Sequence, residues 1–440
     1  MKKIIGKKVI EMGKIEYKKR LVDNELDLKL KTFGGVLIVG PKGCGKTTTA
    51  KQKAKSIVEF QDEDLRDNYL LIANTHPSDL LKGDKPRLFD EWQDAPKIWG
   101  SIRKSIDDED KVGLYILTGS SSNIADTPHT GTLRISRLKM YPMSLYESGE
   151  STGEVSLREL FDNKDSFSTC ESKLSIDDIK YVICRGGWPL CFKSQNLESQ
   201  LLIARDLFYQ TCDVDISNID NVKKNPIWAR AILKSYARNI CTLADQNTIF
   251  ADVQSTYEIS RQTYINYIEA LQKLFIIEDI DAWCPSIRSR TTIRSSKKKN
   301  VIDPSIAAAA LGVTPYYFDQ DYKTLGFLFE SLCIRDLKIY SNSMDGNISY
   351  YRDRYGLEAD GVLHLCDGRY ALIEFKLGQS EIDEGAKHLL KIEELIMQKN
   401  KEEKQCKLRL PDLKIVITAT KYGYKREDGV FVIPIGCLKD

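Results

Sequence analysis

A glycine-rich segment that directly follows an apolar run constrains the fold of this chain more than any other feature. The run Val36–Val39 has the length of a buried strand, and GPKGCGKT (residues 40–47) leads from it into the helix-compatible segment TTTAKQKAKSI. This is the G-x-x-x-x-G-K-[ST] pattern of a phosphate-binding loop between a strand and a helix. The sequence therefore predicts an α/β domain that binds ATP with Mg²⁺.

Each residue type in this loop has a physical role. Glycines let backbone N–H groups turn toward phosphates, Lys46 is expected to reach the β and γ oxygens, and the Thr47 hydroxyl is expected to ligate Mg²⁺. The nucleotide-binding set that we expect is Gly40, Gly43, Cys44, Gly45, Lys46, Thr47, Thr48 and Thr118.

An acidic pair ends the short apolar run at 88–89, in RLFDEWQD. Asp90 is expected to hold Mg²⁺ and Glu91 to orient or deprotonate the attacking water, the two tasks that phosphoryl transfer to water requires. The alternative is an N-cap or a solvated acidic pair. Thr118 and Ser120, at the end of LYILTGSS, are expected to present a hydroxyl to the γ-phosphate or the attacking water.

Two arginines in HTGTLRISRLKM are candidates for stabilising charge on the transferred phosphoryl group. Arg134 or Arg137 could act in its own subunit or in a neighbour's, or either could be a surface arginine. A role in a neighbouring subunit would require a homo-oligomer, which the sequence leaves open.

The pattern along the chain predicts a multidomain α/β protein. Apolar runs at 69–73, 88–89, 114–118 and 133–140 alternate with helix-length charged segments, which is typical of a parallel sheet covered by helices. We expect an N-terminal charged segment (1–32), an ATPase domain (33–150), a helical region (151–245), a winged-helix-like region with a basic wing (246–320) and a nuclease-like domain (321–440).

The winged-helix-like region has the residue types of a nucleic-acid contact. Ser260 can cap a helix whose Thr263, Tyr264 and Tyr267 would face outward as a recognition surface. Basic residues that would neutralise phosphates follow: Arg288, Arg290, Arg294, Lys297, Lys298 and Lys299. The alternative is a solvated loop and a helix packed on the ATPase domain. Upstream lies the turn RGGWP (185–189), and the indole of its Trp188 is expected to pack against the ATPase domain.

The C-terminal part predicts the element order αβββαβ. Asp360 begins one strand, and Glu374 and Lys376 share a face of the strand paired to it, so the carboxylates could bind a second divalent metal, Mg²⁺ or Mn²⁺. Lys376 would activate water for attack on a phosphodiester, and Glu330 would add a ligand. Alternating charges also occur on the wet face of an edge strand, so cleavage of nucleic acid is one of two interpretations.

Several strings together resemble a known family. GPKGCGKTT, LFDEWQDAPKIW, YILTGSSS, RLKMYPMSLYESGES, RGGWP, DAWCPSIRSR, DPSIAAAALG and GFLFESLCIRDL resemble prokaryotic AAA-type ATPases with a C-terminal domain of unknown function, from about residue 33 to beyond 378. The resemblance implies a winged-helix middle and a C-terminal domain similar to the PD-(D/E)xK restriction-endonuclease fold. It assigns Lys46 and Thr47 to nucleotide, Asp90 and Glu91 to magnesium and hydrolysis, and Arg134 to an arginine-finger-like position.

Composition gives no sign of a membrane protein, a zinc protein or a chain that is basic overall. Lys and Arg number 65 against 63 Asp and Glu, so the whole chain has no charge signature of nucleic-acid or membrane binding. No run approaches the roughly 18 apolar residues of a membrane span, and the 11 cysteines form no Cys-x-x-Cys pair. We expect a cytoplasmic protein. It would be an ATP-driven machine acting on nucleic acid, a nucleotide-dependent switch whose nuclease-like fold only binds a partner, or a nucleotide-gated defence or toxin-like nuclease that shares the residues of the first.

Overall fold

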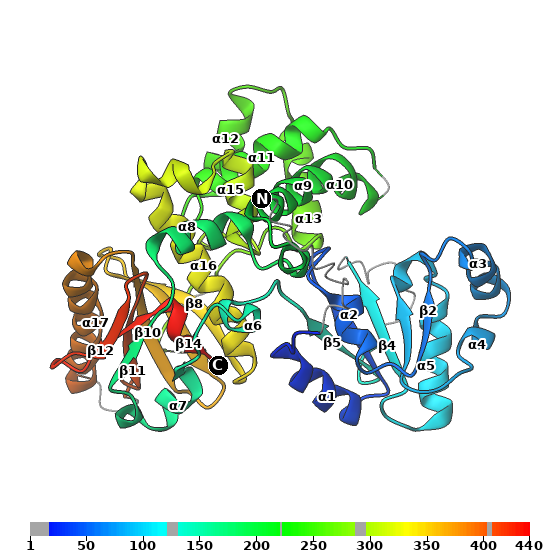
Figure 1. Ribbon diagram of the computed structural model, residues 1–440, viewed down its shortest axis with the longest axis horizontal. Coiled ribbons are helices and arrows are strands. Elements are labelled where there is room, and N and C mark those ends of the chain that lie inside the picture. Colours follow the sequence, from blue (N-terminus) through cyan, green and yellow to red (C-terminus); the bar gives the residue numbers. More distant parts are fainter. Residues whose placement is uncertain (1–16, 121–130, 221, 287–295, 403–406) are drawn as a thin grey trace, which may run out of the picture.

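The computed structural model describes residues 17–120, 131–220, 222–286, 296–402 and 407–440. The molecule has three lobes: an ATPase lobe in blue and cyan, a helical lobe mainly in green, and a C-terminal lobe mainly in orange and red (Figure 1). Helix α16 (Tyr322–Asn342), in yellow, runs between the helical and C-terminal lobes and is buried over most of its length. Among the described residues no helix has the length and apolarity to cross a membrane.

The ATPase lobe is built on a parallel sheet, as expected. Within the described residues the strand order is β2-β3-β4-β1-β5, with β1 at Gly35–Val39, β2 at Ser56–Glu59, β3 at Arg87–Asp90, β4 at Tyr115–Gly119 and β5 at Ile135–Lys139. Its helices are α1 (Val22–Thr32), α2 (Lys46–Lys51), α3 (Arg66–Thr75), α4 (Pro77–Leu80) and α5 (Ile98–Glu109). All five residues of β1 are buried, because β4 and β5 cover both of its edges and helices cover its faces.

One expected strand is wrong. Residues 69–73 lie within helix α3, and the strand that completes the sheet is β2, a short edge strand with one fully buried residue, Val58. A short apolar run such as YLLIA fits a helix face and a strand equally well, so periodicity alone could not separate the two. The remaining expected strands of this lobe are confirmed at β1, β3, β4 and β5.

The middle of the chain is helical, as expected. Its helices are α8 (Ile176–Arg185), α9 (Leu197–Gln210), α10 (Ile216–Asn218), α11 (Pro226–Arg238), α12 (Gln246–Gln254), α13 (Arg261–Lys273) and α15 (Pro304–Leu311). The recognition surface expected on α13 is wrong, because Tyr264 and Tyr267 are 1% and 3% exposed. Their rings pack against Phe250 and Trp228, so this face of α13 belongs to the core of the lobe.

The basic wing also needs correction. Lys298 and Lys299 are buried and form ion pairs with carboxylates, and Lys297 pairs with Asp281 at 2.8 Å, so these ammonium groups do not form a phosphate-binding surface. Between Phe275 and Val301 the described residues form isolated bridges, such as Ile280 with Lys298. Arg288, Arg290 and Arg294 lie outside the described residues.

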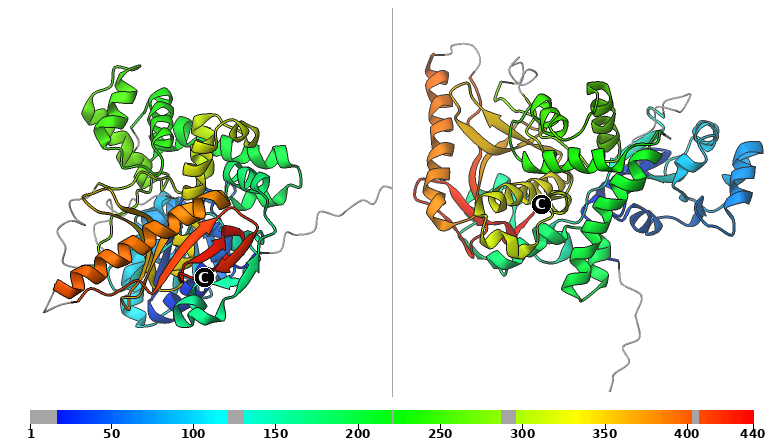
Figure 2. Two further views of the ribbon diagram at one scale, coloured as in Figure 1. Left: turned by 90° about the vertical axis from the view of Figure 1, so that its left-hand side faces the viewer. Right: turned by 90° about the horizontal axis from the view of Figure 1, so that it is seen from above.

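The C-terminal lobe contains the expected αβββαβ order. After α16 come β8 (Gly346–Arg352), β9 (Glu358–Leu365), β10 (Tyr370–Lys376), α17 (Ile382–Glu402) and β11 (Leu413–Thr418), followed by β12 (Tyr422–Lys425), β13 (Phe431–Pro434) and β14 (Leu438–Lys439). The larger mixed sheet has the order β7-β12-β13-β11-β10-β9-β8, in which β7 (Thr169–Glu171) precedes the helical lobe in sequence. Residues of β10 alternate between two cores: Leu372 packs with α17, and Ile373 faces the core that contains α16. Figure 2 shows α17 lying along the outer face of the sheet.

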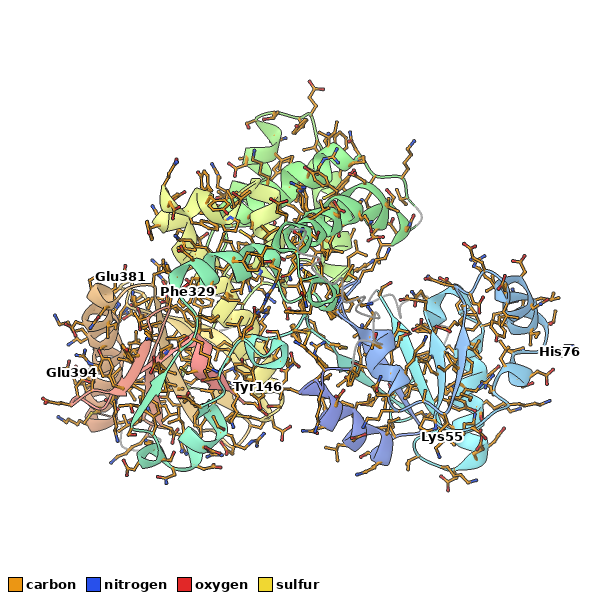
Figure 3. All side chains as sticks on the ribbon, viewed as in Figure 1. Lys55, His76, Tyr146, Phe329, Glu381 and Glu394 are labelled. Atoms are coloured by element: carbon orange, nitrogen blue, oxygen red, sulfur yellow. The ribbon has the colours of Figure 1, made fainter. Side chains whose placement is uncertain are left out.

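Residues 155–171, which we expected in the helical region, belong to the C-terminal lobe. The segment that follows α6 (Leu145–Ser148) forms β6 (Val155–Ser156), α7 (Leu157–Asp162) and β7 (Thr169–Glu171). Strand β6 pairs with β14 and β7 pairs with β12, so this segment completes the C-terminal lobe. Side chains fill the space around α16, where Phe329 is 1% exposed (Figure 3).

Candidate functional site: a phosphate-binding loop and an acidic pocket

The phosphate-binding loop leaves β1 at the carboxyl edge of the parallel sheet and enters α2. Gly40 and Gly45 have φ angles of 155° and 102°, and a Cβ at Gly40 would lie 2.2 Å from the carbonyl oxygen of Met140. Only glycine fits such a position. The first backbone N–H groups of α2 have no partner within the helix, so they are available to phosphate oxygens.

The Lys46 side chain lies inside this loop. Its ammonium group donates hydrogen bonds to the carbonyl oxygens of Gly40 (3.0 Å) and Pro41 (2.9 Å), and the residue is 5% exposed. A phosphate oxygen can replace these two neutral acceptors with a charged one, which makes a shorter and stronger hydrogen bond. The lysine is thus held at the place where the expected phosphate contact would form.

Three hydroxyl and carboxylate groups meet beside the loop. The Thr47 hydroxyl donates to Asp90 Oδ1 at 2.7 Å, and the Thr118 hydroxyl donates to the same oxygen at 2.5 Å. These groups come from α2, β3 and β4, whose ends meet at one edge of the sheet. A threonine hydroxyl and an aspartate are hard oxygen ligands of the kind that Mg²⁺ prefers, so the residues present fit the expected ion.

Glu91 follows in a backbone conformation that non-glycine residues rarely adopt. Its φ is 53° and its ψ is 51°, and its backbone N–H donates to the Thr118 hydroxyl at 3.1 Å. The carboxylate accepts hydrogen bonds from the side chains of Gln93 and, at 3.2 Å, Ser120. The sequence analysis did not identify Gln93 as a partner of Glu91. The one sequence feature that points to this contact is its position two residues after Glu91, in the same tight turn.

The structure also places the remaining residues of the expected nucleotide-binding set. Gly43 and Thr48 are exposed along the loop and the start of α2, whereas Cys44 is fully buried with its thiol directed at the Met140 carbonyl, 3.7 Å away. Cys44 therefore offers only its backbone to a ligand.

Arg134 does not reach this site within its own chain. It precedes β5, and its carbonyl oxygen accepts from the N–H of Gly35, the first residue of β1. It therefore lies at the amino edge of the sheet, roughly 16 Å of strand from the loop, and its side chain pairs with Asp107 at 2.6 Å. The expected arginine finger is wrong for the same subunit and stays a prediction for a neighbouring one. Arg137 lies within β5, paired with Leu37.

Two segments from outside the sheet cover the loop. The Arg20 guanidinium donates to the Cys44 carbonyl at 3.1 Å and forms a 3.0 Å ion pair with Glu147 of α6. Trp188 is 1% exposed, and one of its ring carbons lies 3.9 Å from the place of a Cβ on Gly43. The expected packing of this indole against the ATPase domain is confirmed.

A second cluster of charges lies in the C-terminal lobe, and we call it the acidic pocket: Lys298, Glu330, Glu358, Asp360, Glu374 and Lys376. It has a volume of about 410 Å³. Lys376 Nζ lies 3.0 Å from Glu374 Oε2, so these two side chains share one face of β10, as expected. Asp360 Oδ2 accepts from the Phe375 N–H at 3.0 Å, which fixes that carboxylate between β9 and β10.

Burial and charge shift the pKa values in this pocket. Burial raises the pKa of Glu374 to about 8, and the nearby Asp360 charge adds to the effect, which Lys376 opposes. Burial favours the neutral form of Lys298, but Glu330, Asp360 and Glu358 outweigh it and hold the pKa of Lys298 well above its usual value. Lys298 is therefore a buried ammonium ion.

The acidic pocket does not fit the expected second metal. Lys298 Nζ lies 2.9 Å from Glu330, 2.7 Å from Glu358 and 3.9 Å from Asp360, so an ammonium group stands among the expected ligands. No group of three or more His, Cys, Asp or Glu side chains within the described ranges is arranged to hold a metal ion.

Comparisons with known families match three segments of the chain. Residues 33–149 match an AAA domain family, residues 176–317 match a domain of unknown function (DUF8612), and residues 325–438 match another (DUF4143). The chain thus has an AAA-type P-loop ATPase domain followed by two domains of unknown function. No curated protein matches.

Solved structures resemble the chain only distantly. A Walker-type ATPase of Pyrococcus abyssi is 10% identical, covers 68% of this chain and 99% of its own, and has a TM-score of 0.40. A DNA replication initiation factor is 13% identical, covers 57% of this chain and 86% of its own, and has a TM-score of 0.21. At such scores neither likeness carries an argument about this chain.

Proposed function

We propose that this protein is a magnesium-dependent ATPase that works as a nucleotide-dependent switch. The observation that carries the proposal is the meeting of Lys46, Thr47, Asp90, Glu91 and Thr118 at one edge of the parallel sheet. These groups have the chemistry that phosphoryl transfer to water requires: a cation for the phosphates, hard ligands for a metal and a carboxylate for water.

Each residue has a role in this proposal. Lys46 leaves the Gly40 and Pro41 carbonyls and binds the β and γ oxygens of ATP. Thr47 and Asp90 would hold the magnesium ion, which when bound neutralises charge on the phosphate oxygens. Glu91 orients the attacking water and accepts its proton, after giving up its hydrogen bonds to Gln93 and Ser120.

A chain of buried polar contacts connects the loop with the other lobes. Beside Trp188, whose indole N–H donates to Ser305 at 2.9 Å, the Gly187 N–H donates to Asp303 at 3.0 Å. Asp303 in turn accepts from Arg335 of α16 at 2.9 Å. A loop that moves when ATP binds would therefore press on the start of α15 and on α16.

A second set of contacts returns from α16 to the loop. Asp336 accepts from the backbone N–H of Leu145 at 2.9 Å, and α6 continues to Glu147. Glu147 pairs with Arg20, which contacts the loop at Cys44. Because these groups are buried and hydrogen bonded, breaking one contact leaves a polar group without a partner, which favours movement of the connected elements together.

The test measures hydrolysis and coupling in the same protein. Lys46→Ala is expected to lose ATP binding, whereas Lys51→Ala, an exposed lysine of α2 paired with Glu59, is the matched control and should behave as the parent. Hydrogen exchange with and without a non-hydrolysable ATP analogue then reports the switch. Slower exchange in α15 and α16 is expected, and changes confined to residues 33–149 would contradict the switch.

A second candidate is an ATPase coupled to cleavage or binding of nucleic acid by the C-terminal lobe. The αβββαβ order and the pairing of Glu374 with Lys376 favour it. The ammonium group of Lys298 beside Asp360 speaks against metal-dependent cleavage. Incubating plasmid DNA with the protein, ATP and Mn²⁺ decides: cleavage that disappears in Asp360→Ala would favour this candidate over the switch.

A further inference from the structure

We propose that Lys298 is a built-in cation that takes the place of a divalent metal in the acidic pocket, so that the assembled protein binds no divalent metal there. The proposal does not depend on ATP hydrolysis. It follows from the position of the ammonium group, from the way its backbone is held and from the charges around it.

The position of the ammonium group is that of a bound cation. Lys298 is 1% exposed, and its Nζ lies between Glu330 of α16 and Glu358 of β9 at 2.9 and 2.7 Å, with Asp360 of β9 at 3.9 Å. The two short distances are those of charge-assisted hydrogen bonds. A divalent ion shared by the same carboxylates would have to stand where this nitrogen stands.

The backbone around Lys298 holds the side chain in place. Its N–H donates to the Ile280 carbonyl at 3.0 Å, and the Ile280 N–H donates back to the Lys298 carbonyl at 2.8 Å. On either side, the Tyr350 hydroxyl donates to the Ser296 carbonyl and the Lys299 N–H donates to the Thr242 carbonyl at 2.8 Å. These bonds fix the backbone from which the lysine side chain enters the pocket, and withdrawing the ammonium group would leave the buried carboxylates without their partner.

The carboxylates of the acidic pocket already face cationic side chains without a metal. Its four carboxylates face Lys298, Lys376 and Arg352, whose guanidinium lies 3.6 Å from Glu358, and His388 stands 3.6 Å from Glu374 at the rim. A divalent ion would add two positive charges within a few ångströms of a buried ammonium group, where screening is weak. Repulsion therefore opposes the binding of a metal as long as Lys298 is in place.

The lysine and the carboxylates belong to different parts of the chain. Lys298 lies in the segment that matches one domain of unknown function (176–317), whereas Glu330, Glu358 and Asp360 lie in the segment that matches the other (325–438). The pocket is thus completed only where the two domains meet. Its role in this chain is to join them through a buried ionic contact, which breaks at high cost when one partner is removed.

The test is Mn²⁺ binding to the full chain without nucleotide, followed by electron paramagnetic resonance. The parent is expected to show no Mn²⁺ site that depends on Asp360. Lys298→Met removes the charge and keeps an unbranched side chain one atom shorter, so it should gain a site with affinity raised about tenfold or more. This site should disappear in the double variant with Asp360→Asn.

Two outcomes would overturn the proposal. One is a Mn²⁺ site in the parent that Asp360→Asn removes, and the other is a folded Lys298→Met protein that gains no site. If Lys298→Met does not fold, the parent decides through Fe²⁺-mediated backbone cleavage with peroxide: cuts near 358–376 would refute the built-in cation, and their absence there would support it.

Discussion

The buried carboxylate of Asp303 is the clearest place to perturb the contact between lobes. It accepts hydrogen bonds from Gly187 (3.0 Å) and Arg335 (2.9 Å), and its other oxygen caps α15 through the Ser305 N–H at 3.0 Å. It is fully buried, and Arg335 is 3% exposed. Asp303→Ala removes one partner of a buried ion pair and an N-cap at once.

The expected loss is about 3 kcal/mol. Removing one partner of a buried pair costs about 3 to 5 kcal/mol, and loss of a cap costs about 1 kcal/mol. Arg335 keeps its 2.7 Å pair with Asp336 and so is not left without a partner, which lowers the ion-pair loss to about 2 kcal/mol and brings the sum with the cap to about 3 kcal/mol. A loss of this size raises the population of the open form of α16 by about 100-fold.

Native-state hydrogen exchange of the α16 amides measures this opening directly. Exchange about 100-fold faster than in the parent is expected for Asp303→Ala. Asp79→Ala is the matched control, because Asp79 pairs with Lys82 on the surface, where both side chains are more than half exposed. If α16 exchanges at the same rate in both variants, the reasoning about the buried contact is refuted.

Three further predictions concern other parts of the chain. Thr118→Val should lower kcat for ATP about tenfold with little change in KM, because the Glu91 N–H loses its acceptor; an unchanged kcat in steady-state kinetics would contradict this. Arg134→Ala should leave ATP affinity within about twofold of the parent in a nucleotide titration, because the residue lies at the far edge of the sheet. Burial raises the pKa of Glu278, but Lys338 and Lys139 outweigh it and lower the pKa to about 2. Ionised Glu278 therefore stabilises the fold at pH values above its unfolded-state pKa of about 4.3, and this stabilisation is lost as the pH falls toward 2. In urea titrations the free energy of unfolding of Glu278→Gln should be about 3 kcal/mol below that of the parent near pH 6, and the difference should close by pH 2. A difference that stays constant with pH would contradict this prediction.

Local motifs made the ATPase site predictable. The loop at 40–47 and the acidic pair Asp90 and Glu91 could each be recognised from an apolar strand, the turn after it and the residue types in that turn. The parallel sheet then brings both motifs to one edge. Gln93 could not be predicted as a partner of Glu91, because the bond depends on the positive φ of Glu91 and on the side-chain direction in that turn.

Residues whose role depends on distant contacts were not predictable. Lys298 lies in a basic run that resembles a solvated wing, and only the carboxylates of α16 and β9, more than 30 residues away, make it a buried ion. Tyr264 fits an exposed helix face by type, yet its ring packs on Phe250 of α12. In both cases the local sequence pattern predicts an exposed side chain, whereas contacts with distant parts of the chain bury it.

The central claim, that Glu91 serves ATP hydrolysis, is tested most directly by steady-state hydrolysis with Mg²⁺. The parent should hydrolyse ATP, and Glu91→Gln should lower kcat by about 100-fold or more while still binding ATP. Asp94→Asn is the matched control, because this carboxylate belongs to the same turn but contacts Gln61 outside the site, and it should retain the parent rate. Equal rates in the parent and Glu91→Gln would contradict the account.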